Sequence, residues 1–600
     1  MQRRFLAGAI AILIAALLAT STARIVGDGA EYVAMAMNFA AFHGPSIAPG
    51  DLDGLQAGVA AIDSRVAGWD IRGSTVPGPD RYRDFAHFWI YPLIATPFVW
   101  MAHATGMSPL AAFTAVNVCL LIGAVWCATR WIGAAAAVLL FVSPVLWWID
   151  KPHTEVFTFA LLAIAFLFIR DRPAWSMAAS GLAAAQNLPI AAVTVVTALG
   201  HVLHQRGMVR DRGFLIGTLS AAGLCAIQPL YTYARHGTAT LLSLQNPGHA
   251  PAWAEIIAVP FDPAIGLVAH FPGLVAGMVV AAALVWRSRR QSARLDAWVA
   301  IAAAVSFVLT FSQAANVHHG GTPGFSRYVV WLIPLTIPLF ARLRDGDRFE
   351  GQAWIWPVAV ASAALSVFLY RPAVEENARE PTPLAHYLWT RHPGWNNPLP
   401  EVFAEVSAHQ DVRSAPVWTR GCEKVLLIGR GTDAPIPVRC VPATVPPECA
   451  REGALCYANL DAKNYRFVRA PGSAVAWSGF TYEPDRVWPS GSESGARELL
   501  EQADWWTLHV RSGEGAALRL SRGVRVTELH GPSRLVFILR DIKAGAEIVL
   551  RVPSGARGTL VDAATRQPVD TLDYTGPALE PWSIAVPSGS SLLLLILSVP

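Results

Sequence analysis

Three short polar clusters stand out between residues 1 and 370, a stretch that otherwise holds few charges. They are Gly27 to Tyr32 (GDGAEY), Ile149 to Glu155 (IDKPHTE) and His318 to Tyr328 (HHGGTPGFSRY). A carboxylate can take a proton from a hydroxyl group, and an arginine can hold a phosphate through a forked pair of hydrogen bonds. The clusters therefore contain the residue types that a group transfer from a phosphate donor needs.

The first cluster offers two carboxylates and a phenol. We expect Asp28 to act as a general base, and Glu31 and Tyr32 to contact the substrate. The same spacing is that of a capping box, in which Asp28 caps a helix and Glu31 is its third residue. Both interpretations can hold together, because a capping carboxylate beside a cavity can still accept a proton.

The second cluster combines acidic, basic and imidazole side chains in one short connection. Lys151 is the only lysine between residues 1 and 370, and His153 and Glu155 follow it closely. We expect Glu155 to be catalytic, and Lys151 and His153 to bind substrate. The alternative is local, because an acid at the start of a helix interacts favourably with the helix dipole.

The third cluster places two histidines before a glycine-rich turn and an Arg-Tyr pair. We expect His318, His319, Arg327 and Tyr328 to contact the substrate, with Arg327 on a phosphate. The alternative is an arginine at a helix end that extends its charge to the membrane surface. Adjacent histidines alone are a weak metal signal, so the metal ligands are left unassigned.

The overall composition argues against a soluble protein. The 600 residues are 53% hydrophobic and 15% charged, whereas soluble domains average about 25% charged residues. The stretch 1–370 holds only 41 Asp, Glu, Lys and Arg, and the much shorter stretch 371–600 holds 49. The net charge of +4 and the absence of a basic tract disfavour a nucleic-acid partner. We therefore expect a membrane region followed by a polar domain.

The apolar runs and the arginines between them predict a topology. Residues 5–19 form a first crossing that starts in the cytoplasm, unless Ser21 to Ala23 is a signal-peptidase site. Placing five later arginine-bearing links in the cytoplasm gives about eleven transmembrane helices in all. The ten later crossings are expected at 108–129, 133–149, 155–170, 174–186, 188–203, 213–231, 264–286, 296–314, 328–341 and 354–370.

One further run, residues 87–104, does not fit this count as a crossing. Two prolines and several aromatic residues interrupt it, which favours a re-entrant or interfacial helix over a span. We therefore expect residues 24–107 to form the first outer loop. All three polar clusters then lie on the outer side of the membrane.

The polar stretch 371–600 is expected to form a mainly-β, sandwich-like domain outside the cytoplasm. Short apolar runs at 425–428, 536–539, 547–550 and 591–597 predict strands. Four cysteines cluster here, which suggests two disulfides in an oxidising compartment; nearest-neighbour pairing is one of three connectivities. These cysteines are Cys422, Cys440, Cys449 and Cys456.

The order of these features resembles the GT-C superfamily of membrane glycosyltransferases, which includes protein mannosyltransferases and aminoarabinose transferases of lipid A. The resemblance covers roughly residues 1–370, as the transmembrane catalytic domain, and leaves 371–600 as the outer β domain. It implies that Asp28 matches the first-loop catalytic acid and Glu155 the second-loop acid, with Arg327 near the donor phosphate. The Asp-Gly-Ala-Glu stretch departs from the tight acidic pair of the family.

The resemblance implies an enzyme that moves a sugar from a polyprenyl-phosphate donor to a cell-envelope glycan, lipid or protein, with inversion. It would sit in a bacterial-type inner membrane with its N-terminus in the cytoplasm. The residues name no cofactor, although a divalent cation could assist. Two alternatives stay open: a transporter or flippase of lipid-linked saccharides, which should show inverted repeats, and a non-catalytic anchor for the β domain.

Overall fold

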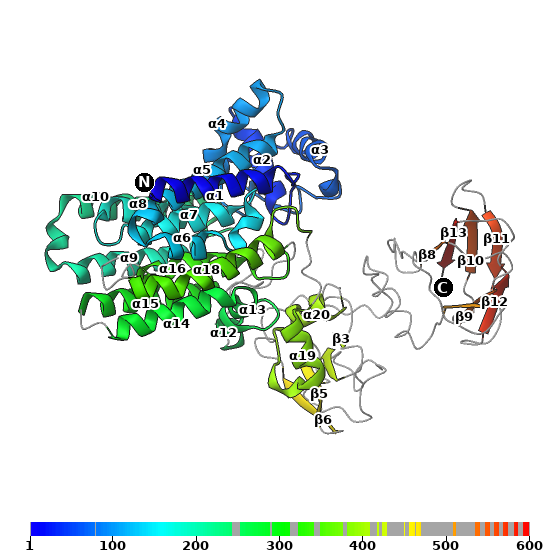
Figure 1. The fold of residues 1–600 in the computed structure, drawn as a ribbon. Helices are drawn as coiled ribbons and strands as arrows, with labels where there is room; N and C mark the ends of the chain where they lie inside the picture. Colours follow the sequence, from blue (N-terminus) through cyan, green and yellow to red (C-terminus); the bar gives the residue numbers. More distant parts are fainter. Residues whose placement is uncertain are drawn as a thin grey trace. The chain divides into compact units, whose positions relative to one another are not determined.

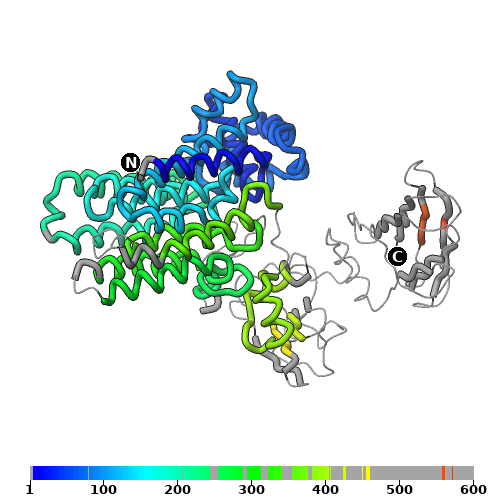
Figure 2. Tube along the Cα trace, in the orientation of Figure 1, coloured from blue at the N-terminus to red at the C-terminus, as the bar shows by residue number. Residues whose placement is uncertain are grey.

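The computed structural model divides the chain into two compact units, residues 1–378 and 379–600 (Figures 1 and 2). The sequence interpretation placed its domain boundary at residues 370 and 371. The structure describes residues 2–78, 80–242, 253–287, 291–312, 322–340, 349–375, 381–408, 417–418, 423–428, 449, 455–461, 464–469, 508–511, 534–540, 547–551, 557–562, 568–573, 581–585 and 592–598.

The polar stretch after the first helix folds into a small subdomain of its own (Figure 1). The first helix, α1 (Gln2–Leu18), leads into it, and a two-stranded antiparallel sheet pairs Thr75 with Phe85. The apolar run of residues 87–104, which the predicted topology does not count as a crossing, forms α4, whose interior contains Pro97. The elements are α2 (Gly29–Ala40), α3 (Leu52–Ile62), η1 (Ser64–Val66), β1 (Thr75–Pro77), β2 (Arg83–Phe85) and α4 (Ile90–Ala104).

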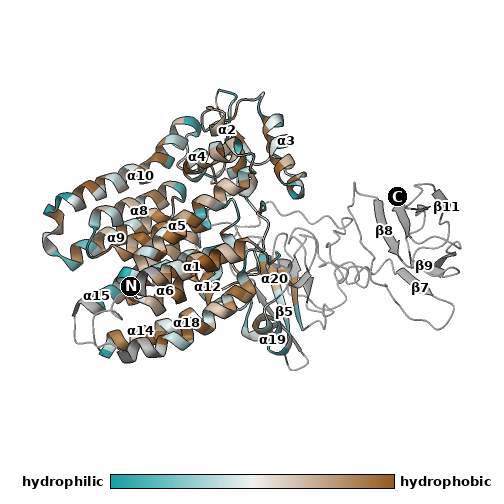
Figure 3. Cartoon of the chain, turned by 45° about the horizontal axis from the view of Figure 1, so that its top comes forward, coloured by the Kyte–Doolittle hydropathy of each residue, from teal (hydrophilic) through white to brown (hydrophobic). Residues whose placement is uncertain are grey.

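The rest of the first unit is a bundle of helices rich in apolar residues (Figure 3). They are α5 (Pro109–Trp131), α6 (Ala134–Phe141), η2 (Pro144–Trp148), α7 (Thr154–Leu167), α8 (Pro173–Gln186), α9 (Ile190–His204), η3 (Arg206–Arg210), α10 (Arg212–His236), α12 (Trp253–Phe261), α13 (Leu267–His270), α14 (Pro272–Arg287), α15 (Gln291–Phe311), α16 (Arg327–Leu335), α17 (Ile337–Phe340) and α18 (Phe349–Tyr370).

Three helical segments among the described residues are long and apolar enough to cross a membrane. They are Pro109–Trp131, Arg212–His236 and Arg294–Phe311. Other apolar helices, such as α7 and α9, are shorter than the roughly 20 residues of a full span. The chain is therefore largely helical and suited to a membrane, while the count of eleven crossings stays a prediction.

Small residues let α8 and α10 approach closely. A side chain added at Gly181 would come within 2.6 Å of the Cα of Ala221, and one added at Gly217 within 2.7 Å of the Cα of Ala174. Such contacts between small residues are a common basis of helix packing in membranes, because van der Waals contact replaces the hydrophobic effect there. The pairing fixes where the last turns of α10 lie.

Gln186 anchors the start of α4 to the end of α8. Its Oε1 accepts from the backbone nitrogen of Tyr91 at 2.7 Å, and its Nε2 donates to the carbonyl oxygen of Phe88 at 2.7 Å. The hydroxyl of Tyr91 in turn donates to Asn117 at 2.9 Å. These buried bonds fix the chain segment that follows residue 87.

We expect Gln186→Leu to lower the free energy of unfolding by about 2–4 kcal/mol, because it leaves two buried backbone groups without partners. Thermal unfolding of the purified protein in detergent measures the change. Gln205→Leu is a matched control, since Gln205 is exposed at the end of α9. Equal unfolding temperatures for the two variants would contradict the anchoring role.

The second unit contains short helices and three sheets among its described residues. Its helices are α19 (Pro383–Arg391), η5 (Pro393–Trp395) and α20 (Pro400–Ala408). The sheets have the strand orders β3-β4-β5-β6, β12-β9-β7 and β11-β10-β13-β8. The strands are β3 (Val417–Trp418), β4 (Lys424–Ile428), β5 (Leu455–Asp461), β6 (Asn464–Arg469), β7 (Leu508–Arg511), β8 (Arg534–Arg540), β9 (Glu547–Arg551), β10 (Arg557–Asp562), β11 (Pro568–Asp573), β12 (Pro581–Ala585) and β13 (Leu592–Ser598).

The four runs predicted as strands correspond to β4, β8, β9 and β13, within about one or two residues at each end. Of the predicted disulfides, the bond between Cys449 and Cys456 is confirmed. Cys422 and Cys440 lie outside the described residues. A sandwich-like arrangement of the strands stays a prediction.

Candidate functional site

Asp28 and Arg327 are 299 residues apart in the sequence and in direct contact in the fold. The Nη1 of Arg327 donates to the Oδ2 of Asp28 at 2.7 Å. The Nε2 atoms of His87 and His153 lie 3.3 Å and 3.7 Å from the same oxygen. The second and third polar clusters of the sequence thus both meet the first cluster at the carboxylate of Asp28.

The two carboxylates of the first cluster meet at His87. Its Nδ1 lies 3.0 Å from the Oε2 of Glu31, and its Nε2 faces Asp28. Asp28 stands at the N-cap position of α2, but its side chain makes no capping hydrogen bond. The capping box that the spacing allows is therefore not formed, and both carboxylates are turned toward the imidazole.

A close backbone approach brings the first two clusters together. A side chain added at Gly29 would lie 3.2 Å from both the Cγ and the carbonyl oxygen of Pro152. The start of α2 therefore packs directly on the connection before α7. Arg327 completes the site as the first residue of α16, which packs against α7.

Tyr32 forms the aromatic centre of this cluster. It is buried, and its ring makes edge contacts with His87 and His153, at centroid distances of 5.8 Å and 5.5 Å. A third edge contact, at 5.9 Å, joins it to Tyr91. Tyr32 therefore holds both imidazoles at fixed places beside the carboxylates.

Glu155 and His153 form a buried pair next to Asp28. The Nδ1 of His153 contacts the Oε2 of Glu155, and Glu155 is fully buried as the second residue of α7. The other imidazole nitrogen points toward Asp28. Glu155 therefore reaches the site through His153, and it is placed to orient that ring.

Lys151 makes a different set of contacts. Its Nζ lies 2.5 Å from the Oδ1 of Asp150 and donates to the carbonyl oxygen of Pro372 at 3.0 Å. It also sits 4.3 Å from the centre of a ring of Trp147, and its side chain is completely buried. These contacts tie the connection before α7 to the chain after α18, which is a positioning role.

The third cluster is described only in part. Tyr328 accompanies Arg327: its hydroxyl lies 3.3 Å from Nη2, and the guanidinium lies 5.2 Å from its ring centre. His318 and His319 lie outside the described residues. Asp28, Glu31, Tyr32, His153, Glu155, Arg327 and Tyr328 thus come together in one cluster.

His87 is the residue that the sequence interpretation missed. It begins the apolar run of residues 87–104 and falls between β2 and α4. The histidines predicted from the sequence all lie within the three polar clusters, and His87 lies outside them. The useful signal was a histidine at the border between a polar loop and an apolar run, three residues after Asp84.

The cluster shifts the proton equilibria of two of its groups. Burial raises the pKa of Glu31, and this outweighs the opposing effect of His87. Burial alone would lower the pKa of His87, but the negative charges of Asp28 and Glu31 outweigh it and raise the pKa to about 9. His87 is therefore an imidazolium at neutral pH.

This shift predicts a pH-dependent stability. Because the pKa of His87 rises from 6.5 to about 9 on folding, its contribution is complete below pH 6.5 and is lost as the pH rises through 9. The contribution is on the order of 3 kcal/mol. Thermal unfolding between pH 6 and 10 should show the wild-type protein losing more stability than His87→Gln. Parallel pH profiles would refute the assignment.

Three side chains of the cluster could also hold a metal ion. Ligand atoms of Asp28, Glu31 and His87 all lie within 4.8 Å of one another, and oxygen and imidazole ligands suit several divalent cations. An imidazole binds a metal in its neutral form, whereas the raised pKa keeps His87 protonated. Arg327 and His87 already balance the two carboxylates, so a bound cation would compete with them.

No protein-family model, curated protein or solved structure matches this chain.

Proposed function

We propose that this protein is a membrane glycosyltransferase that moves a sugar from a polyprenyl-phosphate donor to an acceptor hydroxyl outside the cytoplasm, with inversion. The observation that carries the proposal is the contact between Asp28 and Arg327 at 2.7 Å. It puts a group that can accept a proton next to a group that can bind a phosphate. A transfer from a phosphate donor needs both within one site.

One hydrogen-bond donor of the Arg327 guanidinium is available to such a phosphate. Its Nη1 and Nη2 are used by Asp28 and Tyr328, whereas its buried Nε has no hydrogen-bond partner within the described residues. The side chain is 12% exposed. A buried donor without a partner is unfavourable, so a phosphate oxygen at this position would be held strongly.

The reaction balances as a single displacement. The acceptor oxygen forms a bond to the anomeric carbon as the bond from that carbon to the phosphate oxygen breaks. The acceptor proton passes to Asp28, and the polyprenyl phosphate leaves with its charge stabilised by Arg327. Because no covalent enzyme intermediate forms, the configuration at the anomeric carbon is inverted.

Glu31 is the second carboxylate within the site, and its chemistry makes it a rival base. The Oδ2 of Asp28 is surrounded by Arg327 and two imidazoles, which stabilise its charged form. Burial raises the pKa of Glu31, which makes this carboxylate a better proton acceptor than an ordinary glutamate. We assign the base to Asp28, because it alone contacts the residue assigned to the phosphate.

The proposed topology supports this chemistry. With the N-terminus in the cytoplasm and about eleven crossings, the cluster would face outward from a bacterial-type inner membrane. Lipid-linked sugars are donors that reach that side, whereas nucleotide sugars would be on the cytoplasmic side. The strand-rich C-terminal region would then lie outside the cytoplasm, consistent with its Cys449–Cys456 disulfide.

A direct assay tests the proposal. The full-length protein in lipid nanodiscs is incubated with polyprenyl-phosphate mannose, glucose or arabinose and with a solubilised cell-envelope fraction. We expect one donor to be consumed, with release of polyprenyl phosphate and a product of inverted configuration. Transport of the intact donor across a vesicle membrane, without its consumption, would support a flippase instead and would refute the proposal.

A further inference from the structure

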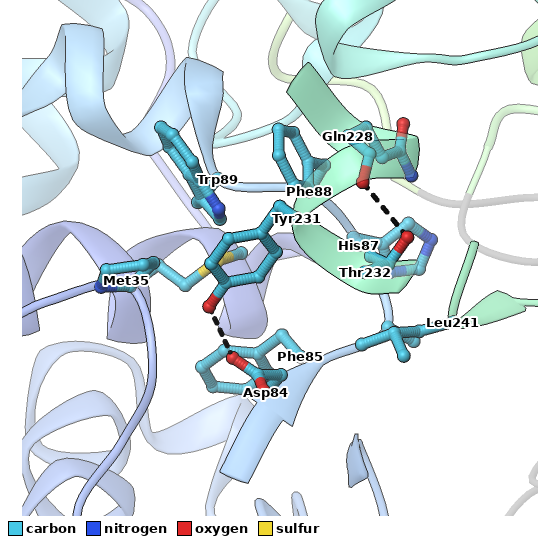
Figure 4. A pocket seen from close by; sticks show the side chains of 12 residues that line it. Met35, Asp84, Phe85, His87, Phe88, Trp89, Gln228, Tyr231, Thr232 and Leu241 are labelled. Atoms are coloured by element: carbon cyan, nitrogen blue, oxygen red, sulfur yellow. Dashed lines mark hydrogen bonds between the residues drawn. The ribbon is translucent and has the colours of Figure 1, made fainter. Parts of the chain in front are cut away.

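A small pocket lies directly beside the carboxylate cluster, and the transfer as proposed gives it no role. It is bounded by the end of β2, which carries Asp84 and Phe85, by the connection from β2 to α4, and by the last turns of α10 (Figure 4). Met35 of α2 and Leu241 also line it. His87 belongs to its lining and also contacts Asp28 and Glu31. The pocket therefore borders the groups assigned to catalysis.

Aromatic rings form much of the wall. Phe88 and Trp89 pack together at a centroid distance of 4.7 Å, and both make edge contacts with Tyr231 at 5.8 Å and 5.9 Å. In Figure 4 the indole nitrogen of Trp89 is turned toward Tyr231. These rings give the wall apolar surface against which the C–H groups of one ligand edge can pack, and the indole N–H adds a polar end.

Two polar atoms of the wall lack partners within the described residues. They are the Oε1 of Gln228 and the Nε1 of Trp89, both buried. Gln228 itself is only 4% exposed. Buried polar groups are nearly always hydrogen-bonded, and an unpaired one is unfavourable. A hydroxyl group both donates and accepts, so each of these two atoms can be satisfied by a ligand hydroxyl.

The pocket offers no net charge to an ionic ligand. Its one carboxylate, Asp84, accepts from Tyr231 and Arg235, at 2.7 Å and 2.8 Å. Ser46 and His236 contact the same carboxylate at 2.7 Å and 2.8 Å. Asp84 therefore holds the end of α10 against β2, and its charge is balanced. The charge of His87, which also lines the pocket, is paired with Asp28 and Glu31. The other hydrogen-bonding groups of the wall are neutral, which favours a neutral hydroxylated ligand.

The enclosed part of the pocket is narrow, with room for about one water-sized group. A hydroxyl or hydroxymethyl group fits this space, whereas a whole ring does not. The ligand therefore enters by one edge. His87, which lines the pocket, also contacts Asp28 and Glu31, so one side chain connects the pocket with the two carboxylates.

From this geometry we propose that the pocket is the acceptor subsite and that the acceptor is a neutral saccharide, one hydroxyl-bearing edge of which is held by Gln228 and Trp89. This inference rests on the proposed function, since it assigns an acceptor to the transfer. It narrows the acceptor from glycan, lipid or protein to a glycan. It also makes Gln228 and Trp89 binding residues with no part in proton transfer.

Binding can be measured without transfer. Saturation-transfer NMR on the full-length protein in nanodiscs is run with methyl glycosides of glucose, galactose, mannose and arabinose as probes, and with N-acetylthreonine amide as a peptide hydroxyl. We expect at least one glycoside to bind, and Gln228→Met to weaken it about tenfold by removing one hydrogen-bonding group. Trp89→Phe, which keeps a ring but removes the N–H, should weaken it similarly.

Tyr233→Phe is the matched control, because Tyr233 is exposed on the same helix, and it should bind as the wild type does. Thermal unfolding of each variant checks that the fold is kept. Glycosides that bind Gln228→Met as well as the wild type, or that bind neither, overturn the proposal. So does threonine amide binding that depends on Gln228 in place of glycoside binding.

Asp28→Asn separates this inference from the proposed function. It should keep glycoside binding and lose transfer. Glycoside binding that depends on Gln228, in a protein that consumes no polyprenyl-phosphate donor, would support the pocket and refute the transfer. Transfer that depends on Asp28 but is unchanged in Gln228→Met would support the enzyme and overturn the subsite.

Discussion

Asp28→Asn is expected to reduce sugar transfer by about 10²–10⁴-fold, the range that a positioned general base contributes. The amide keeps the shape of the carboxylate but cannot take the acceptor proton. Glu31→Gln should lose much less, within about tenfold, because Glu31 supports the site through His87. Initial rates of donor consumption in nanodiscs, measured between pH 6 and 9, give both values.

The two variants decide between the carboxylates. If Glu31→Gln is the inactive variant and Asp28→Asn retains transfer, the base is Glu31, whose pKa burial raises. Asp53→Asn is a matched control, since Asp53 is an exposed carboxylate on α3 paired with Arg72, and it should keep full activity. Loss of activity in the control would point to a general effect of charge.

Arg327→Gln is expected to lower kcat/KM by about 10²–10³-fold, as for other losses of a group that stabilises developing charge. Arg327→Lys should recover only part of this loss, because an ammonium group cannot contact Asp28, Tyr328 and a phosphate in one plane. Steady-state kinetics with varied donor concentration measure the effect. A change in KM alone would show that Arg327 binds the donor without stabilising the transition state.

Arg327→Gln also removes the partner of a part-buried carboxylate, so stability must be followed separately. Breaking a buried ion pair destabilises by about 3–5 kcal/mol, and the double variant with Asp28→Asn should restore part of the unfolding temperature. It should not restore transfer. Arg371→Gln is the control, because Arg371 is an exposed arginine just after α18. Recovered transfer in the double variant would show that the role of Arg327 is structural.

The sequence predicted those features of the structure that depend on residue type and on neighbours along the chain. The rarity of charge in residues 1–370 singled out Asp28, Glu155 and Arg327, because charges in apolar surroundings are unfavourable unless they are paired or used. Short apolar runs predicted strands that are present as β4, β8, β9 and β13. The clustered cysteines left three connectivities open, and the nearest-neighbour one includes the bond between Cys449 and Cys456 that the structure contains.

Spacing was misleading where a local interpretation competed with a distant partner. The Asp-Gly-Ala-Glu stretch has the form of a capping box, yet both carboxylates turn to His87, which lies 56 residues beyond Glu31. For Lys151, substrate binding stays a prediction, and its described contacts are with Asp150, Trp147 and Pro372. The partner of both carboxylates therefore comes from another part of the chain, and Lys151 joins its neighbour Asp150 to the chain after α18.

The sequence by itself therefore determined the residue types of the site, the largely helical first region and the strands of the second. Only the tertiary structure decided which charges face each other: Arg327 with Asp28, His153 with Glu155, and His87 between Asp28 and Glu31. The reason is physical. Helix and strand patterns follow from neighbours within a few residues, whereas contacts across 56 or 299 residues depend on how α2, α4, α7 and α16 pack.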